Sequence, residues 1–547
     1  MEFFTQKWYN HGKNEGITMS EKKYFGVMMN VSQAVMKPSK VKEFALYIKK
    51  LGYNMLQLYT EDTYEVNGEE YFGYLRGGYT KGELKDIVSY CESIGIEVIP
   101  CVEVLAHLST LFKWQDYAEI NDSDDILLVG EERTYALIEN IFATLRECFT
   151  SDRVNIGLDE AHNLGLGQYL QRHGYTDKSE IFFSHIEKVT AIAEKYGFIP
   201  MMWSDMLFKN LYGSYYTAKD DGKISEVKNL LPDNLSLVYW EYFFYRPEQY
   251  ESMIKLHKDF DKEVWFAAAV HNYIGAAPSN DMSDDSLRAA ITACRRQNID
   301  HFIITLWGGS ECSHFLTLPS LCYARCVFEG QEDKETIRKR FYEATGENYD
   351  AIRALDAPNT LAASYLELPE IDFCRYVLYQ DVFSGYFDTV LKEGSCERYD
   401  EKADELLQMK KHSRFGYLFE AEAALLRAMY IKHDLGLQLR RAYKAGDRTA
   451  LMKLREKITA AAQAVKEFHT AATVVWKTEN NPQGMEINDI KLGGLICRLK
   501  NCAQMLGEYL NGETDSIPEL SAELKSFNAV RTNYLFWSRI TTVNRFD

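Results

Sequence analysis

The sequence lacks the features that mark several large classes of protein. No stretch of its 547 residues approaches the roughly 18 consecutive apolar residues that would span a bilayer, and its start has no apolar core of signal-peptide length. A clustered Lys/Arg stripe is also missing, and the net charge of −18 disfavours phosphate-rich partners. We therefore expect no membrane partner, no nucleic-acid partner and a cytoplasmic location.

Paired cysteine motifs are absent as well. The 11 cysteines are scattered singly and have an odd total, which is typical of reduced core residues rather than of a disulfide framework. Cys322 and Cys326 lie one helical turn apart without a matching His/Cys pair, so we expect no zinc site. We predict neither metal nor cofactor. The hydrophobic share of 46% and the charged share of 26% are those of an ordinary globular protein.

Short apolar runs alternate with helix-period segments from about residue 24 to 330. The segment Ser39 to Leu51, for example, places its apolar residues on one face and is followed by Gly52. A doubly wound sheet would need a glycine-rich phosphate loop after its first strand, and residues 29–33 contain no glycine. We therefore predict a (β/α)8 barrel of the α/β class, with its chemistry at the carboxyl ends of the strands. The eight predicted strands are Tyr24 to Asn30, Met55 to Tyr59, Glu97 to Val104, Val154 to Leu158, Ile199 to Ser204, Leu235 to Trp240, Glu263 to Ala269 and Phe302 to Trp307.

The remainder of the chain changes character after about residue 355. A connector rich in Pro and Leu precedes long helical stretches, in which apolar residues recur at a spacing of three and four. We predict an N-terminal extension over 1–22, the barrel over 23–355 and an all-α domain over 356–547 that supports the barrel and mediates a homodimer contact. The two apolar seams consist of Leu451, Leu454, Ile458, Ala461, Val465 and Phe468, and of Leu492, Leu495, Leu499, Cys502, Leu506 and Tyr509.

The most informative segment is RVNIGLDEAHNLGLG, residues 153–167. Its β-branched run ends in two adjacent carboxylates, Asp159 and Glu160, at the point where a buried strand gives way to a loop. A charge at that position has to be paired, hydrogen-bonded or shifted in pKa. The structural alternative is that Asp159 caps the next helix and Glu160 completes its first turn.

Polar and aromatic residues also follow the other predicted strands. Carboxylates surrounded by tryptophans indicate a sugar substrate. Adjacent Asp and Glu fit the variant of glycoside hydrolysis in which the 2-acetamido oxygen of the sugar attacks, because the protein then needs only an orienting Asp and an acid Glu. In strand order these residues are Glu61 and Asp62; Glu103 and His107; Asp159 and Glu160; Trp203 and Asp205; Trp240, Glu241 and Tyr242; His271, Asn272 and Tyr273; and Trp307 and Glu311.

The segment VNIGLDEAH resembles the catalytic motif of glycoside hydrolase family 20, the exo-acting β-N-acetylhexosaminidases. Other segments resemble its cytoplasmic bacterial branch with a helical C-terminal domain, and they occur in order from about residue 24 almost to the end. They are LYTEDTYEVNGEEYFGYLRGGYT, PCVEVLAHLSTLFKW, MMWSDM, VYWEY and, more weakly, TLWGGSECS and WKTENNPQGMEINDIKLGGL.

The resemblance implies a role for each matching residue. Glu160 would be the general acid/base, and Asp159 would hold the acetamido N–H and stabilise the oxazolinium-like intermediate. Glu61, Asp62 and His107 match a charge relay behind the acid, with Glu103 in support. The expected substrate-binding residues are Gln33, Trp203, Asp205, Trp240, Tyr242, Trp307 and Glu311, and Tyr273 or Tyr242 would support the acetamido oxygen.

The sequence departs from the family at several positions. The family has Asp and Arg at the end of its first strand, where this chain has Asn30 and Gln33. Replacing an arginine clamp by a neutral group costs ~1–2 kcal/mol of sugar binding. The choice between N-acetylglucosamine, N-acetylgalactosamine and a modified sugar therefore stays open. Only about 22 residues precede the first strand, so the small α/β domain common in the family is not expected, and another part of the chain has to cover that flank.

The resulting hypothesis is a metal-free, retaining exo-β-N-acetylhexosaminidase that acts on short oligosaccharides or glycosides. One alternative is a glycosidase of different specificity, such as a β-galactosidase in which Glu160 works with Glu103 or Glu241 as the nucleophile. The other alternative is a carbohydrate-binding protein without activity.

Overall fold

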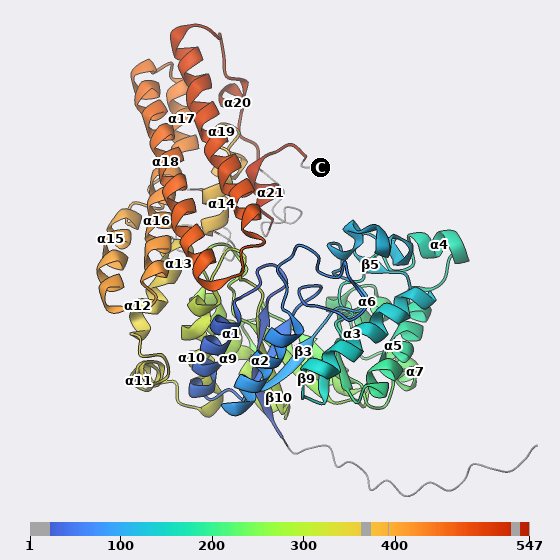
Figure 1. The fold of residues 1–547 in the computed structure, drawn as a ribbon. Helices are drawn as coiled ribbons and strands as arrows, with labels where there is room; N and C mark the ends of the chain where they lie inside the picture. The colour runs from blue at the N-terminus through green and yellow to red at the C-terminus, as the bar shows by residue number, and fades with distance from the viewer. Residues whose placement is uncertain (1–21, 363–372, 392, 527–535, 546–547) are drawn as a thin grey trace, which may run out of the picture.

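The computed structural model describes residues 22–362, 373–391, 393–526 and 536–545. Eight parallel strands close into a barrel in the order β1-β10-β9-β8-β7-β6-β3-β2, and helices surround it, so the predicted (β/α)8 barrel is confirmed (Figure 1). The barrel strands are β1 (Tyr24–Asn30), β2 (Met55–Tyr59), β3 (Glu97–Cys101), β6 (Arg153–Asn155), β7 (Ile199–Trp203), β8 (Ser236–Trp240), β9 (Val264–Ala269) and β10 (His301–Leu306).

Four strands end earlier than the apolar pattern predicts: β7 and β10 by one residue, and β3 and β6 by three. β3 ends at Cys101 rather than Val104, and β6 ends at Asn155 rather than Leu158. Gly157 and Leu158 have φ angles of 74° and 75°, and left-handed backbone cannot continue a strand. The residues that follow β6 therefore turn away from the barrel wall.

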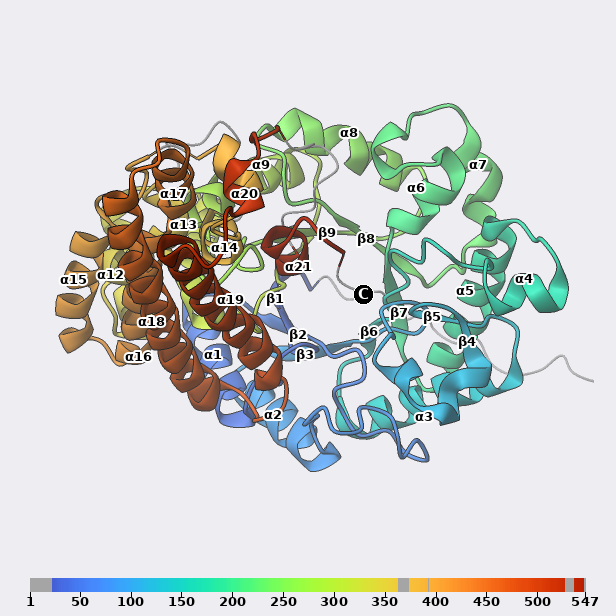
Figure 2. The same cartoon turned by 90° about the horizontal axis from the view of Figure 1, so that it is seen from above.

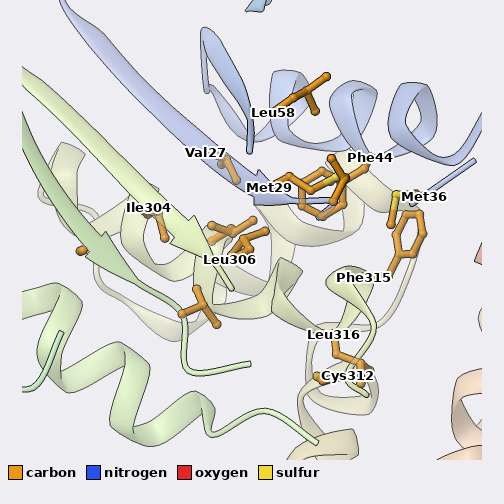
Figure 3. Packing of buried hydrophobic residues seen from close by; sticks show 14 of the residues in the cluster. Val27, Met29, Met36, Phe44, Leu58, Ile304, Leu306, Cys312, Phe315 and Leu316 are labelled. Atoms are coloured by element: carbon orange, nitrogen blue, oxygen red, sulfur yellow. The ribbon is translucent and has the colours of Figure 1, made fainter. Parts of the chain in front are cut away.

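The core has two layers, which explains why most of the strand residues are apolar on both faces. Alternate side chains such as Met28 and Trp265 fill the inside of the barrel. Their neighbours, such as Val27 and Met29, point outward and pack against helix residues that include Phe44 (Figure 3). Both faces of each strand are thus buried.

Helices follow the strands as the sequence predicts. The first of them ends where Gly52, with φ 103°, donates its N–H to the carbonyls of Ile48 and Lys49. A small hairpin of β4 (Asn121–Ser123) and β5 (Ile126–Leu127) lies in the loop after β3. The barrel helices are α1 (Pro38–Leu51), α2 (Lys81–Ser93), α3 (Glu132–Cys148), α4 (Gln168–His173), α5 (Lys178–Lys195), α6 (Asp205–Tyr212), α7 (Lys223–Val227), α8 (Pro247–Lys258), α9 (Asn280–Arg296), α10 (Leu318–Glu329) and α11 (Lys334–Thr345).

The described C-terminal residues are helical, and both predicted apolar seams are buried apart from the partly buried Tyr509. The two longest helices, α18 and α19, lie side by side (Figure 1). The helices are α12 (Tyr349–Arg353), α13 (Ala357–Thr360), α14 (Phe373–Tyr379), α15 (Tyr399–Met409), α16 (Gly416–Lys432), α17 (Leu435–Lys444), α18 (Arg448–Glu479), α19 (Met485–Asn511), α20 (Pro518–Ser521) and α21 (Trp537–Thr541).

The turn between α18 and α19 covers the barrel beside β1. The backbone N–H of Lys37 donates to the carbonyl of Glu479 (2.8 Å), and the side-chain amide of Asn481 donates to the carbonyl of Gly77 (2.7 Å). Seen from above, both helices lie over the side of the barrel that carries α1 (Figure 2). The C-terminal helices therefore pack against the barrel on the side of β1 and α1.

The predicted domain boundaries stay predictions. Residues 1–21, which make up nearly all of the predicted extension, lie outside the described residues, as does part of the connector after residue 355. Ten of the 11 cysteines are buried and Cys497 is exposed, as expected for core residues.

Candidate active site

The turn after β6 carries the two acids. Its backbone is left-handed again at Glu160 (φ 50°), and the side chain of Asn155 accepts a hydrogen bond from the N–H of Gly157 (3.1 Å). The side chain of Asp159 is 12% exposed and that of Glu160 is 45% exposed. The turn therefore holds one acid in the wall of the site and the other at its opening.

His107, which follows β3, contacts both acids. Its Nε2 lies 3.3 Å from Oδ2 of Asp159 and 3.9 Å from Oε2 of Glu160. Its backbone N–H donates to the carboxylate of Asp125 (3.2 Å). Burial disfavours the charged ring, but the neighbouring carboxylates, with Asp159 first, outweigh burial and raise the pKa of His107 to about 11. The imidazole is therefore a cation at neutral pH.

Two further acids follow β2. Burial raises the pKa of Glu61 to about 7, and the hydroxyl of Tyr59 donates to its Oε1 (3.2 Å). Asp62 is buried, accepts a hydrogen bond from the hydroxyl of Thr110 (2.9 Å) and pairs with Arg76 (3.2 Å). Burial also raises the pKa of Asp62, while the guanidinium opposes this shift. Glu61 therefore faces the site, and Asp62 anchors the loop behind it.

The electrostatics favour a protonated acid at the opening. Burial raises the pKa of Glu160, and the charges of Asp159 and Asp205 raise it further. A general acid needs this shift because it has to hold its proton near neutral pH. Burial, followed by the charge of Asp159, raises the pKa of Glu103 well above its usual range. Glu103 therefore favours the neutral form, and neither of its carboxyl oxygens has a hydrogen-bond partner among the described residues.

Asp205 supports the site from behind. It is fully buried, and its Oδ2 accepts hydrogen bonds from the backbone N–H of Glu160 (3.3 Å) and from Lys209 (2.8 Å). Its Oδ1 accepts the indole N–H of Trp240 (3.4 Å). The predicted substrate-binding role does not match this position, because protein donors surround the carboxylate. Asp205 instead positions Glu160 and one aromatic wall.

Aromatic rings form the floor and walls. The indole N–H of Trp307 donates to the hydroxyl of Tyr242 (3.0 Å), and its ring lies edge-on to Tyr59, with the centroids 5.0 Å apart. The ring centroids of Trp203 and Trp307 are 6.2 Å apart. The indole nitrogen of Trp203 is buried without a hydrogen-bond partner among the described residues. An unsatisfied donor in the wall of a polar cavity is suited to a ligand oxygen.

These side chains surround one cavity that is open to solvent, and the empty space in and above it, open solvent included, is about 890 Å³. The hydroxyl of Ser310 donates to Oε1 of Gln33 (2.9 Å), which leaves the amide group of Gln33 at the rim. The wall on the side of β1 is therefore neutral. The cavity is lined by Asn30, Gln33, Tyr59, Glu61, His107, Asp159, Glu160, Trp203, Trp240, Tyr242, Phe243, Tyr273 and Trp307.

Glu311 does not line this cavity. Its Oε2 lies 2.9 Å from Arg375 of α14, and its Oε1 lies 2.7 Å from Lys491 of α19. Burial opposes ionisation, but these two cations outweigh it and lower the pKa of Glu311 to about 2. The prediction of a sugar ligand at this position is therefore corrected, because the carboxylate joins the barrel to the C-terminal helices.

Sequence reasoning missed two cavity residues, Tyr59 and Phe243. Tyr59 is the last residue of an apolar strand, and the sequence does not say which of its side chains point inward. Phe243 belongs to the aromatic run 242–245 after β8, which is the only signal that marks it. Within the described residues, no group of three or more His, Cys, Asp or Glu is arranged to hold a metal ion. None of the described helices has the length and apolarity needed to cross a bilayer.

A parallel barrel with adjacent acids and aromatic walls at the carboxyl ends of its strands has the architecture of a glycoside hydrolase. Two family models agree with this class. The catalytic domain of glycosyl hydrolase family 20 matches residues 43–245, and the glycoside hydrolase 20C C-terminal domain matches residues 349–534. Together they match more than half of the chain, which therefore belongs to glycoside hydrolase family 20.

Curated relatives match parts of the chain. Hexosaminidase D of Bos taurus is 27% identical over 169 residues, which are 29% of this chain and 49% of that protein. Hexosaminidase D of Homo sapiens is 25% identical over 190 residues, which are 33% of this chain and 39% of that protein. The matches thus span about half or less of the length of these relatives.

Solved structures of similar proteins include a GH20 exo-β-N-acetylglucosaminidase from Vibrio harveyi, with a TM-score of 0.46 and 13% identity over 61% of this chain and 58% of that chain. A GH20 β-N-acetylhexosaminidase from Streptomyces coelicolor has a TM-score of 0.42 and 16% identity over 59% of this chain and 69% of that chain. The family assignment rests on the two family models.

Proposed function

We propose that the protein is an exo-β-N-acetylhexosaminidase that removes a terminal β-linked N-acetylglucosamine or N-acetylgalactosamine with retention of configuration. The observation that carries the proposal is that Asp159 and Glu160 line the same aromatic cavity while the pKa of Glu160 is raised. An orienting carboxylate beside a protonated acid is the pair that substrate-assisted hydrolysis requires.

The proposed reaction has two steps. Glu160 donates its proton to the glycosidic oxygen while the acetamido carbonyl oxygen attacks the anomeric carbon, so the bond to the leaving group breaks and a cyclic oxazolinium forms. Asp159 accepts the acetamido N–H and stabilises the positive charge, and Tyr242 or Tyr273 supports the acetamido oxygen. Water then attacks the same carbon, loses a proton to Glu160 and opens the ring.

The charge relay is part of this proposal. His107, held as a cation by the carboxylates around it, links Asp159 and Glu160. Glu61 lines the same cavity, and the buried Asp62 and Glu103 lie behind the lining. Trp203, Trp240 and Trp307 would enclose the sugar. Gln33 would replace the expected arginine clamp with a neutral donor.

The alternative two-carboxylate mechanism has less support than the proposed substrate-assisted one. Its candidate nucleophiles, Glu103 and Glu241, are each 1% exposed and do not line the cavity.

Hydrolysis of a panel of aryl β-glycosides of N-acetylglucosamine, N-acetylgalactosamine, galactose and 6-substituted sugars tests the proposal. Turnover of an N-acetylhexosaminide that is blocked by a thiazoline mimic of the oxazoline supports it. Turnover of the galactoside alone, or of no glycoside, would contradict it.

We also propose a homodimer that forms through the outer face of α19. Ile487, Ile490, Gly494 and Cys497 lie on this face at a spacing of three, four and three, and the two isoleucines are exposed. Light scattering after gel filtration should show a dimer that Ile490→Glu converts to a monomer, while Tyr342→Glu on the barrel helix α11 should not. A wild-type monomer would contradict this contact.

The cytoplasmic location stays a proposal as well. It is supported by the 11 cysteines, which form no disulfide bond with one another, because a reducing compartment keeps thiols reduced. Fractionation of the source cells with an antibody against the chain tests it, and recovery outside the cytoplasm would refute it.

A further inference from the structure

Two exposed aromatic side chains lie at or beside the cavity, outside the set expected to hold the terminal sugar. Phe243 lines the cavity with 43% of its surface exposed, and Tyr216 of the 3-10 turn Tyr215–Thr217 is 59% exposed. Tyr216 itself does not line the cavity, but the preceding Tyr215 stacks on Trp240, which does. The turn that carries Tyr216 is therefore packed against the cavity wall.

The strand order sets the direction in which the leaving group departs. In the ring of eight strands, β7 lies four positions from β1 in either direction, and β6 and β8 flank it (Figure 2). Asn30 ends β1 and Gln33 follows it, whereas Glu160 follows β6. A sugar whose anomeric oxygen is protonated by Glu160 therefore points its leaving group toward β6, β7 and β8. Tyr216 lies in the connection from β7 to β8, after α6, and Phe243 lies in the loop after β8.

The backbone beneath both aromatic residues is held in place. The N–H of Phe243 donates to Oε1 of the buried Glu241 (3.0 Å), and the ring of Phe243 lies 5.6 Å from that of His271. Tyr215, which precedes Tyr216, stacks on Trp240 with centroids 5.6 Å apart, and its hydroxyl donates to the carbonyl of Trp240 (3.3 Å). The exposed rings are thus anchored to the walls of the cavity.

We propose that Phe243 and Tyr216 form an aglycone subsite that binds the second sugar ring of a neutral oligosaccharide; this rests on the function proposed above. Exposed aromatic faces pack well against the apolar face of a pyranose, whose hydroxyl groups stay in water. The net charge of −18 disfavours an anionic aglycone. The substrate class is therefore an N-acetylhexosamine linked to another neutral sugar.

Two donors that share the same terminal sugar test the subsite. One is a disaccharide with the preferred N-acetylhexosamine at its non-reducing end, and the other is the corresponding glycosyl azide, whose leaving group has no ring. In Phe243→Ala and Tyr216→Ala, the ratio of kcat/KM for the disaccharide to that for the azide should fall about 10-fold, which corresponds to about 1.4 kcal/mol of transition-state binding. Tyr342→Ala, which truncates another exposed tyrosine, is the matched control.

A second measurement is transglycosylation, in which the subsite binds the acceptor sugar instead of the leaving group. With the azide as donor and a free monosaccharide as acceptor, both variants should form less disaccharide relative to hydrolysis. Tyr216→Phe should retain the wild-type ratio, because it keeps the ring. Unchanged ratios in both alanine variants would overturn the subsite and leave the proposed function intact. A wild-type protein that cleaves neither donor would overturn the proposed function itself.

Discussion

Glu160 makes two proton transfers in the proposed reaction, one to the leaving oxygen and one from water. Glu160→Gln preserves the size of the side chain but removes its proton, so the loss of rate should grow with the basicity of the leaving group. We expect kcat/KM for a nitrophenyl glycoside to fall less than that for a disaccharide. Steady-state rates over aryl glycosides of graded leaving-group pKa measure this slope. Equal losses on all of them would remove Glu160 as the acid.

Asp159 has a different task, because it holds the substrate's own nucleophile. Asp159→Asn should lower turnover of acetamido sugars by about 10²-fold or more, a loss of about 2.7 kcal/mol in transition-state stabilisation. The exposed Asp152, whose ion pair with Arg146 is long at 3.9 Å, provides the control variant Asp152→Asn. Initial rates of the purified proteins measure the effect. Near-normal rates in Asp159→Asn would refute the orienting role.

At the scale of elements, the turn after β6 requires a glycine at position 157, where there is no room for a side chain. A Cβ on Gly157 would lie 2.1 Å from the carboxylate of Glu103, and the backbone there has φ 74°. Gly197 has the same φ, but a Cβ would meet nothing within 4 Å. The two glycines therefore separate backbone strain from steric clash.

Gly197→Ala should cost only the strain of left-handed backbone, about 1–2 kcal/mol of stability, and leave kcat near wild type. Gly157→Ala should lower stability further and also reduce kcat, because the clash displaces the turn that carries both acids. Thermal unfolding and steady-state kinetics on the two variants check this. Identical effects on kcat would mean that the turn does not fix the acids.

The sequence predicts elements better than it predicts contacts between distant elements. β1 and β2 have the predicted bounds because both of their faces are buried and most of their residues are apolar, with Gln57 the polar exception inside β2. The acid pair is also readable, since adjacent charges at the end of a buried strand are costly. The contacts of Asp205 and Glu311 cannot be predicted from the sequence, because most of their partners lie far away along the chain. Glu311 pairs with Arg375 and Lys491, which lie 64 and 180 residues away.

At the scale of the whole molecule, the barrel and the C-terminal helices meet around a buried acid. Glu479, at the end of α18, accepts hydrogen bonds from the hydroxyls of Ser313 (2.8 Å) and Tyr417 (2.8 Å). Burial raises its pKa from 4.5 to about 7, although the hydroxyl of Ser313 opposes the shift. The folded protein therefore holds this proton more tightly than the unfolded chain does.

The sign of the pH effect follows from this difference. Stability from Glu479 is fully present below pH 4.5 and is lost as the pH rises to about 7. Glu479→Gln stays neutral at every pH, so its Tm relative to wild type should rise by about 1–4 °C between pH 4.5 and pH 8. Glu335→Gln, at an exposed position of α11, is the control. Calorimetry across this range measures the difference, and a constant offset between Glu479→Gln and wild type would show that the acid does not titrate with folding. Because the same α18–α19 turn covers the barrel beside Gln33, a rising offset would also mean that the support of the sugar-binding rim weakens above neutral pH.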